Sequence, residues 1–72
     1  MNNLNVAKIQ LNGNPYEINA ETNLNQLLDK LKIKKTKLAI EVNGVIVEKN
    51  KYLKFILNKG DKVEIVHFIG GG

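Results

Sequence analysis

The 72-residue sequence contains no cysteine, serine, arginine or tryptophan, and its single histidine is His67. The missing cysteine and serine exclude disulfides, cysteine metal sites and the two commonest side-chain nucleophiles. His67 is the one side chain suited to act as a base at neutral pH, but its place in an apolar strand pattern favours a structural role. No HExxH motif, phosphate-binding P-loop or acidic metal loop is present. We therefore expect no catalysis by this chain alone and no bound metal or stable cofactor.

Long apolar segments are also missing. No run approaches the roughly 20 residues that a membrane-spanning helix needs, and the start, MNNLNVAKIQ, lacks the apolar core of a signal peptide. The composition, 43% hydrophobic and 25% charged, is that of an ordinary globular domain. We expect a single-domain cytoplasmic protein, without a membrane partner and monomeric when free.

All eleven basic residues are lysines, and the formal net charge is +4. Such a charge could serve nucleic acid, because phosphate contacts need cations. The lysines are scattered, however, and no arginine is present to bind a guanine edge through two hydrogen bonds. The densest group, between Lys30 and Lys37, also suits the C-terminal end of a helix. We favour this solvated helix end and expect no nucleic-acid partner.

Alternating apolar residues predict a strand over residues 6–11 and a second over 16–19, joined by a turn at 12–15 into a hairpin. The period then changes. Four leucines spaced as on one helix face, Leu24, Leu27, Leu28 and Leu31, predict a helix over about residues 23–33. Thr22 is the predicted N-cap.

A second hairpin follows the helix. Residues 37–42 and 45–48 read as strands around Asn43-Gly44, which is a strong short hairpin signal. Residues 49–61 lack clean alternation and predict a short helical turn or irregular connection. The last strand is expected at residues 62–68, with Val63 and Ile65 pointing to the core.

This order of elements favours an α+β protein with the β-grasp (ubiquitin-like roll) fold, in which a mixed sheet of four to five strands packs on one main helix. We assign residues 1–68 to the β-grasp domain and residues 69–72 to a flexible C-terminal glycine tail. In this fold the first and last strands usually lie side by side at the centre of the sheet. That pairing is not visible in the sequence.

The sequence stops on three glycines, directly after the apolar run VHFI. The carboxylate of Gly72 is inert until its oxygen becomes a leaving group, as it does on adenylation by ATP. Gly70 and Gly71 would let the backbone thread into a narrow site, because glycine permits close approach and any φ. Residues 69–72 reach roughly 13 Å when extended. The alternative is a frayed end without function.

Val66 and Phe68 are expected on the sheet face opposite the core, where polar residues would be usual. Together with Ile69 they predict an apolar docking surface beside the tail. Cover by the chain's own connections is the alternative.

The segments VNGVIVEK and LNKGDKVEIVHFIGGG, with the leucine-rich helix, resemble the sulfur carrier proteins of thiamine biosynthesis, the ThiS family. The resemblance runs from about Lys8 to Gly72. It departs from the pattern of many relatives at Glu48-Lys49, where they have Pro-Arg.

The resemblance implies a β-grasp carrier rather than an enzyme. In that family, an adenylyltransferase of the ubiquitin-activating type activates the terminal glycine with ATP and Mg²⁺. Sulfur from a desulfurase or related sulfurtransferase then converts it to a thiocarboxylate, which passes its sulfur to thiazole synthase. By this resemblance Gly72 bears the thiocarboxylate, and Gly71 is the other member of the Gly-Gly pair.

Three other functions remain open from the sequence. The small subunit of molybdopterin synthase shares the fold and the terminal chemistry. A protein modifier would instead join lysines through an isopeptide bond. A β-grasp binding module that contacts RNA would need no free terminus.

Overall fold

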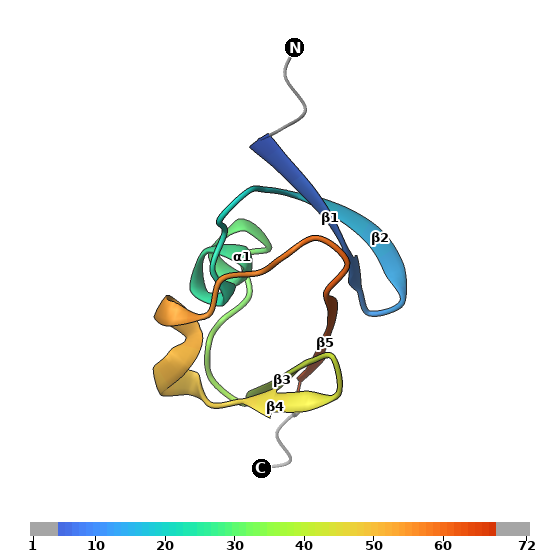
Figure 1. The fold of residues 1–72 in the computed structure, drawn as a ribbon. Coiled ribbons are helices and arrows are strands. Elements are labelled where there is room, and N and C mark those ends of the chain that lie inside the picture. The colour runs from blue at the N-terminus through green and yellow to red at the C-terminus, as the bar shows by residue number, and fades with distance from the viewer. Residues whose placement is uncertain (1–4, 68–72) are drawn as a thin grey trace.

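Residues 5–67 are described by a computed structural model, which contains one five-stranded sheet, one α-helix and a 3₁₀-helix (Figure 1). The order of the strands across the sheet is β2-β1-β5-β3-β4. The elements are β1 (Val6–Leu11), β2 (Asn14–Asn19), α1 (Leu24–Lys30), β3 (Leu38–Val42), β4 (Val45–Val47), η2 (Lys49–Lys54) and β5 (Lys62–His67).

Both hairpins turn at an Asn-Gly pair. Asn12 and Gly13 have φ of 49° and 86°, and Asn43 and Gly44 have φ of 53° and 85°. Two consecutive positive φ values define the type I′ turn, whose twist matches that of the flanking strands. The first turn is tighter than the sequence predicts, because β2 already begins at Asn14 rather than at residue 16.

Pro15 is the reason that the sequence predicts a longer turn. It lies inside β2, opposite Gln10, although proline cannot donate a hydrogen bond to a neighbouring strand. Because β2 is an edge strand, the lost donor faces away from β1 and disturbs no pairing. A turn signal in the sequence is therefore compatible with a strand here.

β5 occupies the centre of the sheet, between the two hairpins (Figure 1). It runs parallel to β1, with Gln10 opposite Lys62, and antiparallel to β3, with Ile40 opposite Ile65. The sheet is therefore mixed, and α1 packs against one of its faces. This confirms the predicted β-grasp fold, with the first and last strands adjacent at its centre.

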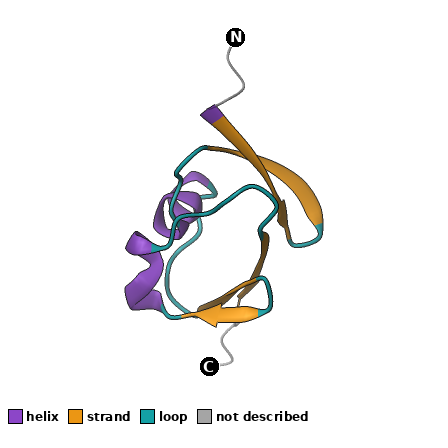
Figure 2. Cartoon of the chain, viewed as in Figure 1, coloured by secondary structure: helices purple, strands orange, loops and turns teal. Residues whose placement is uncertain are grey.

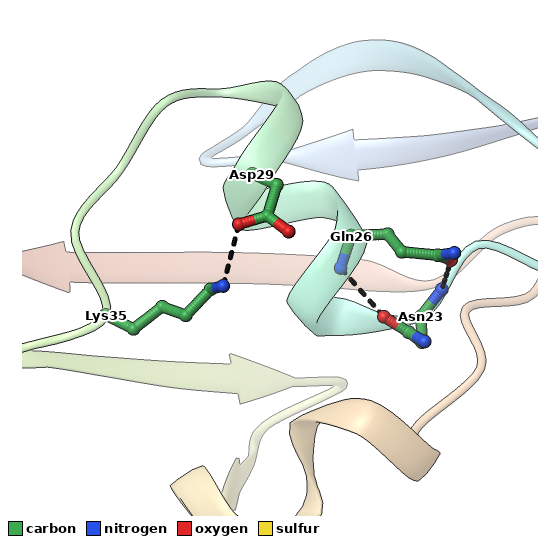
Figure 3. A network of polar contacts seen from close by, with 4 residues as sticks. All are labelled: Asn23, Gln26, Asp29 and Lys35. Atoms are coloured by element: carbon green, nitrogen blue, oxygen red, sulfur yellow. Dashed lines mark hydrogen bonds and ion pairs between the residues drawn. The ribbon is translucent and has the colours of Figure 1, made fainter.

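The helix begins one residue later than predicted, and its cap is Asn23 rather than Thr22. The Asn23 side chain accepts a hydrogen bond from the Gln26 N–H at 2.7 Å, and the Asn23 N–H donates to the Gln26 side chain at 2.9 Å (Figure 3). This reciprocal pair is a capping box. The Thr22 hydroxyl instead donates to the Asn19 carbonyl at 2.6 Å, so the prediction of Thr22 as N-cap was wrong.

The helix also ends earlier than the predicted residue 33. Lys32 has φ of 59°, its N–H donates to the Asp29 carbonyl, and the Ile33 N–H donates to the Leu28 carbonyl. These two bonds form a Schellman motif, which closes a helix with one left-handed residue. That residue is usually glycine, so a lysine gives no stop signal in the sequence. Just beyond, Lys35 forms an ion pair of 2.7 Å with Asp29 (Figure 3).

Asn23→Ala should lower the free energy of unfolding by about 1 kcal/mol, because the Gln26 N–H loses its acceptor. Chemical denaturation measures this change. Asn25→Ala is the matched control, since Asn25 lies inside the helix, where alanine is the better helix former. Equal losses in the two variants would contradict the capping role.

The core lies between the sheet and the two helical segments, which stand on the same side of the sheet (Figure 2). Three helix leucines, Leu24, Leu27 and Leu28, have no exposed surface. They pack with the inward residues of the strands and with Tyr52 and Leu57. Leu31, predicted on the same face, is half-buried at the C-cap. The helical period therefore identified the buried face correctly.

The predicted short helical turn is η2, and its buried residue is Tyr52. Burial raises the pKa of the Tyr52 phenol above its ordinary value, because the ionised form loses hydration. The unfolded chain then loses this proton at lower pH than the folded protein does. The contribution of Tyr52 to stability is therefore fully present below the pKa of the unfolded state, and it is lost as pH rises through the pKa of the folded state.

We therefore expect wild-type stability to fall above about pH 10 more steeply than that of Tyr52→Phe, which has no ionisable group at this position. Urea denaturation of both proteins between pH 8 and 11 measures the difference. The two proteins are identical at every other position, so their difference isolates Tyr52. Parallel pH curves for the two proteins would contradict the assignment.

Candidate functional site at the end of the last strand

Near the end of β5, one face of the strand is buried and the opposite face carries an exposed apolar side chain. Val63 and Ile65 point into the core, as predicted, with 1% and 9% of their surface exposed. Val66 alternates with them and is 52% exposed on the opposite face. The other predicted site residues, Phe68, Ile69, Gly70, Gly71 and Gly72, lie outside the described residues.

Two further residues share the face of Val66. Ala39 lies directly opposite Val66 on β3. Ile46, on β4, lies opposite Glu41, which is two residues after Ala39 in β3 and so points to the same face. Ile46 is 65% exposed. Neither residue was predicted from the sequence, because their side of the sheet follows from the strand register. We call Val66, Ala39 and Ile46 the outer apolar patch.

Two carboxylates border this patch. Glu41 and Glu64 face each other across β3 and β5, and neither forms an ion pair within residues 5–67. Like charges directly opposite on neighbouring strands are destabilising. The outer face thus combines apolar and anionic side chains at the strand that leads toward Gly72, and Lys62, two residues before Glu64, adds a cation on the same side.

His67 lies on the other side of β5, opposite Leu38, and is exposed. No hydrogen bond joins its side chain to any residue of the described range. A nucleophile would need such a base within reach, so the geometry of residues 5–67 gives His67 no hydroxyl to activate.

The same range offers neither a metal site nor a helix that could cross a membrane. Between residues 5 and 67, no three histidine or acidic side chains gather closely enough to hold a metal ion. None of the helices described is both long and apolar enough to cross a membrane. In the lysine-rich segment, Lys30 Nζ lies 5.2 Å from the centre of the Tyr16 ring.

Comparison with known proteins decides between the possible families. The sequence model of the ThiS family matches residues 9–72. The chain belongs to the ThiS family. This confirms the resemblance to the ThiS family seen in the sequence.

Solved structures and curated relatives agree with the ThiS assignment. The crystal structure of the thiamine biosynthesis protein ThiS from Geobacter metallireducens superposes with a TM-score of 0.78 at 29% identity, covering 90% of this chain and 99% of that one. The sulfur carrier protein ThiS of Bacillus subtilis (strain 168) is 34% identical over 65 residues, which are 89% of this chain and 98% of that protein.

A longer relative matches as well. The thiazole synthase of Magnetococcus marinus is 43% identical over 65 residues, or 90% of this chain. The chain spans about a fifth (20%) of the length of that synthase. The thiazole synthase of Paramagnetospirillum magneticum shows the same relation, at 42% identity.

Proposed function

We propose that this ThiS-family protein carries sulfur for thiazole formation in thiamine biosynthesis, as a thiocarboxylate on Gly72. The observation that carries the proposal is the family match, which extends through the glycines to residue 72. Gly72 is the sulfur-bearing residue, and Gly70 and Gly71 give the slim backbone that enters a partner's site.

The chemistry takes place in a partner adenylyltransferase of the ubiquitin-activating type. A carboxylate oxygen of Gly72 attacks the α-phosphate of ATP and displaces pyrophosphate, which forms an acyl-adenylate. Both reactants are anionic, so Mg²⁺ and cationic groups of the partner neutralise them. The terminal sulfur of a persulfide on a desulfurase or related sulfurtransferase then attacks the acyl carbon, and AMP leaves with the bonding electron pair. A thiol next attacks the enzyme-side sulfur of the resulting acyl disulfide, so that a new disulfide forms and the thiocarboxylate on Gly72 leaves.

Thiazole synthase is the proposed acceptor of the sulfur. Two thiazole synthases each contain a segment that is 42–43% identical to this chain over 65 residues. A synthase that carries a ThiS-like segment has the donor and acceptor of sulfur in one protein. This supports thiazole synthase over the large subunit of molybdopterin synthase as the partner.

Intact-mass measurement tests the proposal. The protein is incubated with the adenylyltransferase of its own organism, Mg-ATP and sulfide. We expect the mass increase that corresponds to exchange of one oxygen for sulfur, and transfer of that sulfur when thiazole synthase and its substrates are added. An unchanged mass with a partner that activates another ThiS protein would overturn the proposal.

The outer apolar patch is proposed as the docking surface for the adenylyltransferase, with Phe68 and Ile69 continuing it. Val66→Lys should raise the KM of activation about tenfold, because a charge replaces a buried apolar contact at the interface. Leu53→Lys is the matched control, since Leu53 is equally apolar and 68% exposed but lies on η2. Pyrophosphate release measures both. A normal KM for Val66→Lys would move the docking surface elsewhere.

A further inference from the structure

The contact between β1 and β5 is short and ends in an unusual way. Its parallel register includes Gln10 opposite Lys62 and Leu11 opposite Val63. Backbone hydrogen bonds flank this register, from the Gln10 N–H to the Asp61 carbonyl and from the Asn12 N–H to the Val63 carbonyl, each 2.9 Å long. At Asn12 the chain turns away into the hairpin, with φ of 49°.

The next bond in this parallel ladder is made by a side chain. The Asn12 Oδ1 accepts from the Ile65 N–H at 2.8 Å, between residues 53 positions apart in the sequence. In a regular parallel ladder a backbone carbonyl would fill this place. The Asn12 carboxamide therefore replaces it, and the bond is partly buried.

Beyond Ile65 the support of β5 changes. Val66 pairs with Ala39 and His67 with Leu38, both on β3, whereas the register with β1 does not extend to them. The Asn12–Ile65 bond thus stands where β5 passes from pairing on two sides to pairing on one. Asn12 can form this bond because it is the first residue of the type I′ turn and its side chain faces β5.

We propose that Asn12 is a positioning residue, which holds β5 in place where its pairing with β1 ends and so supports the presentation of Gly72 to the activating partner. This inference rests on the proposed function. Without the carboxamide, the Ile65 N–H loses its partner in a partly buried place. The end of β5 then opens more often, and the activating enzyme must order more of the chain on binding.

A pair of substitutions isolates the hydrogen bond. Asn12→Gly removes the acceptor but accepts positive φ without strain. Asn12→Asp retains an acceptor oxygen, and aspartate also tolerates this φ and forms Asp-Gly type I′ turns. Asn23→Ala serves as the matched control, because it removes an asparagine bond to a backbone N–H at the far helix.

Amide hydrogen exchange comes first, because it needs no partner enzyme. In Asn12→Gly the amides of Ile65 and Val66 should exchange at least about tenfold faster relative to those of α1, whereas Asn12→Asp should restore protection. Unchanged exchange in Asn12→Gly would overturn the inference, whatever the carrier activity proves to be.

Steady-state kinetics with the adenylyltransferase and Mg-ATP then test the consequence. Asn12→Gly should raise KM about three- to tenfold with kcat nearly unchanged, Asn12→Asp should approach wild type, and Asn23→Ala should leave KM unaltered. An equal KM rise in Asn23→Ala would show general destabilisation and overturn the positioning role. Failure of the wild type to be activated would refute the proposed function instead, and the exchange data would still decide the role of Asn12.

Discussion

A chain that lacks Gly72, or that carries one alanine after it, should form no thiocarboxylate although its fold is intact. Deleting or adding one residue moves the terminal carboxylate by roughly 3.5 Å along the extended chain. Reacting atoms must approach within about 3–3.5 Å, and an error of about 1 Å already costs about 100-fold in rate. We therefore expect activation to fall at least 100-fold in both variants.

Intact mass and pyrophosphate release measure this loss, and circular dichroism checks the fold. The matched control has one alanine added before Met1, which changes the mass equally at the other end of the chain. It should be activated like the wild type. Normal activation of the chain extended after Gly72 would refute both the steric argument and the assignment of its carboxylate.

Leu27→Ala should lower the free energy of unfolding by about 3 kcal/mol, which is the usual cost of truncating a buried leucine. Leu27 has no exposed surface and lies in α1 at the centre of the core. Small domains have total stabilities of only about 5–15 kcal/mol, so a large share of the stability would be lost. Urea denaturation followed by circular dichroism measures the change.

The control is the same substitution on the surface. Leu53 is 68% exposed, so Leu53→Ala removes the same atoms with little loss of burial and should change stability by less than about 0.5 kcal/mol. Similar losses for Leu27→Ala and Leu53→Ala would mean that α1 does not pack against the sheet through Leu27.

Local signals predicted much of this fold correctly. The spacing of Leu24, Leu27 and Leu28 identified the buried helix face, because that period follows from helix geometry alone. Asn43-Gly44 identified its hairpin, because few other residue pairs tolerate two positive φ values. Val66 was correctly placed outside the core by alternation within one strand.

Other features depend on parts of the chain that are distant in sequence. Ile46 joins the face of Val66 only through the register of three strands, and Asn12 reaches Ile65 across 53 positions. The choice of Asn23 over Thr22 as the cap was a local error: both residue types can cap a helix, and Gln26 three residues after Asn23 completes the box. The predicted roles of Phe68 to Gly72 stay predictions, since those residues lie outside the described range.

The central place of β5 has a consequence for how the protein is made. The hairpins β1–β2 and β3–β4 are local in sequence, but an isolated hairpin is at best marginally stable in water. β5 joins them, and it follows both along the chain. A ribosome must therefore synthesise residues 62–67 before the sheet can close. The outer apolar patch and the strand leading to Gly72 are thus assembled in the same late step, so an unfinished chain offers an activating enzyme neither of them.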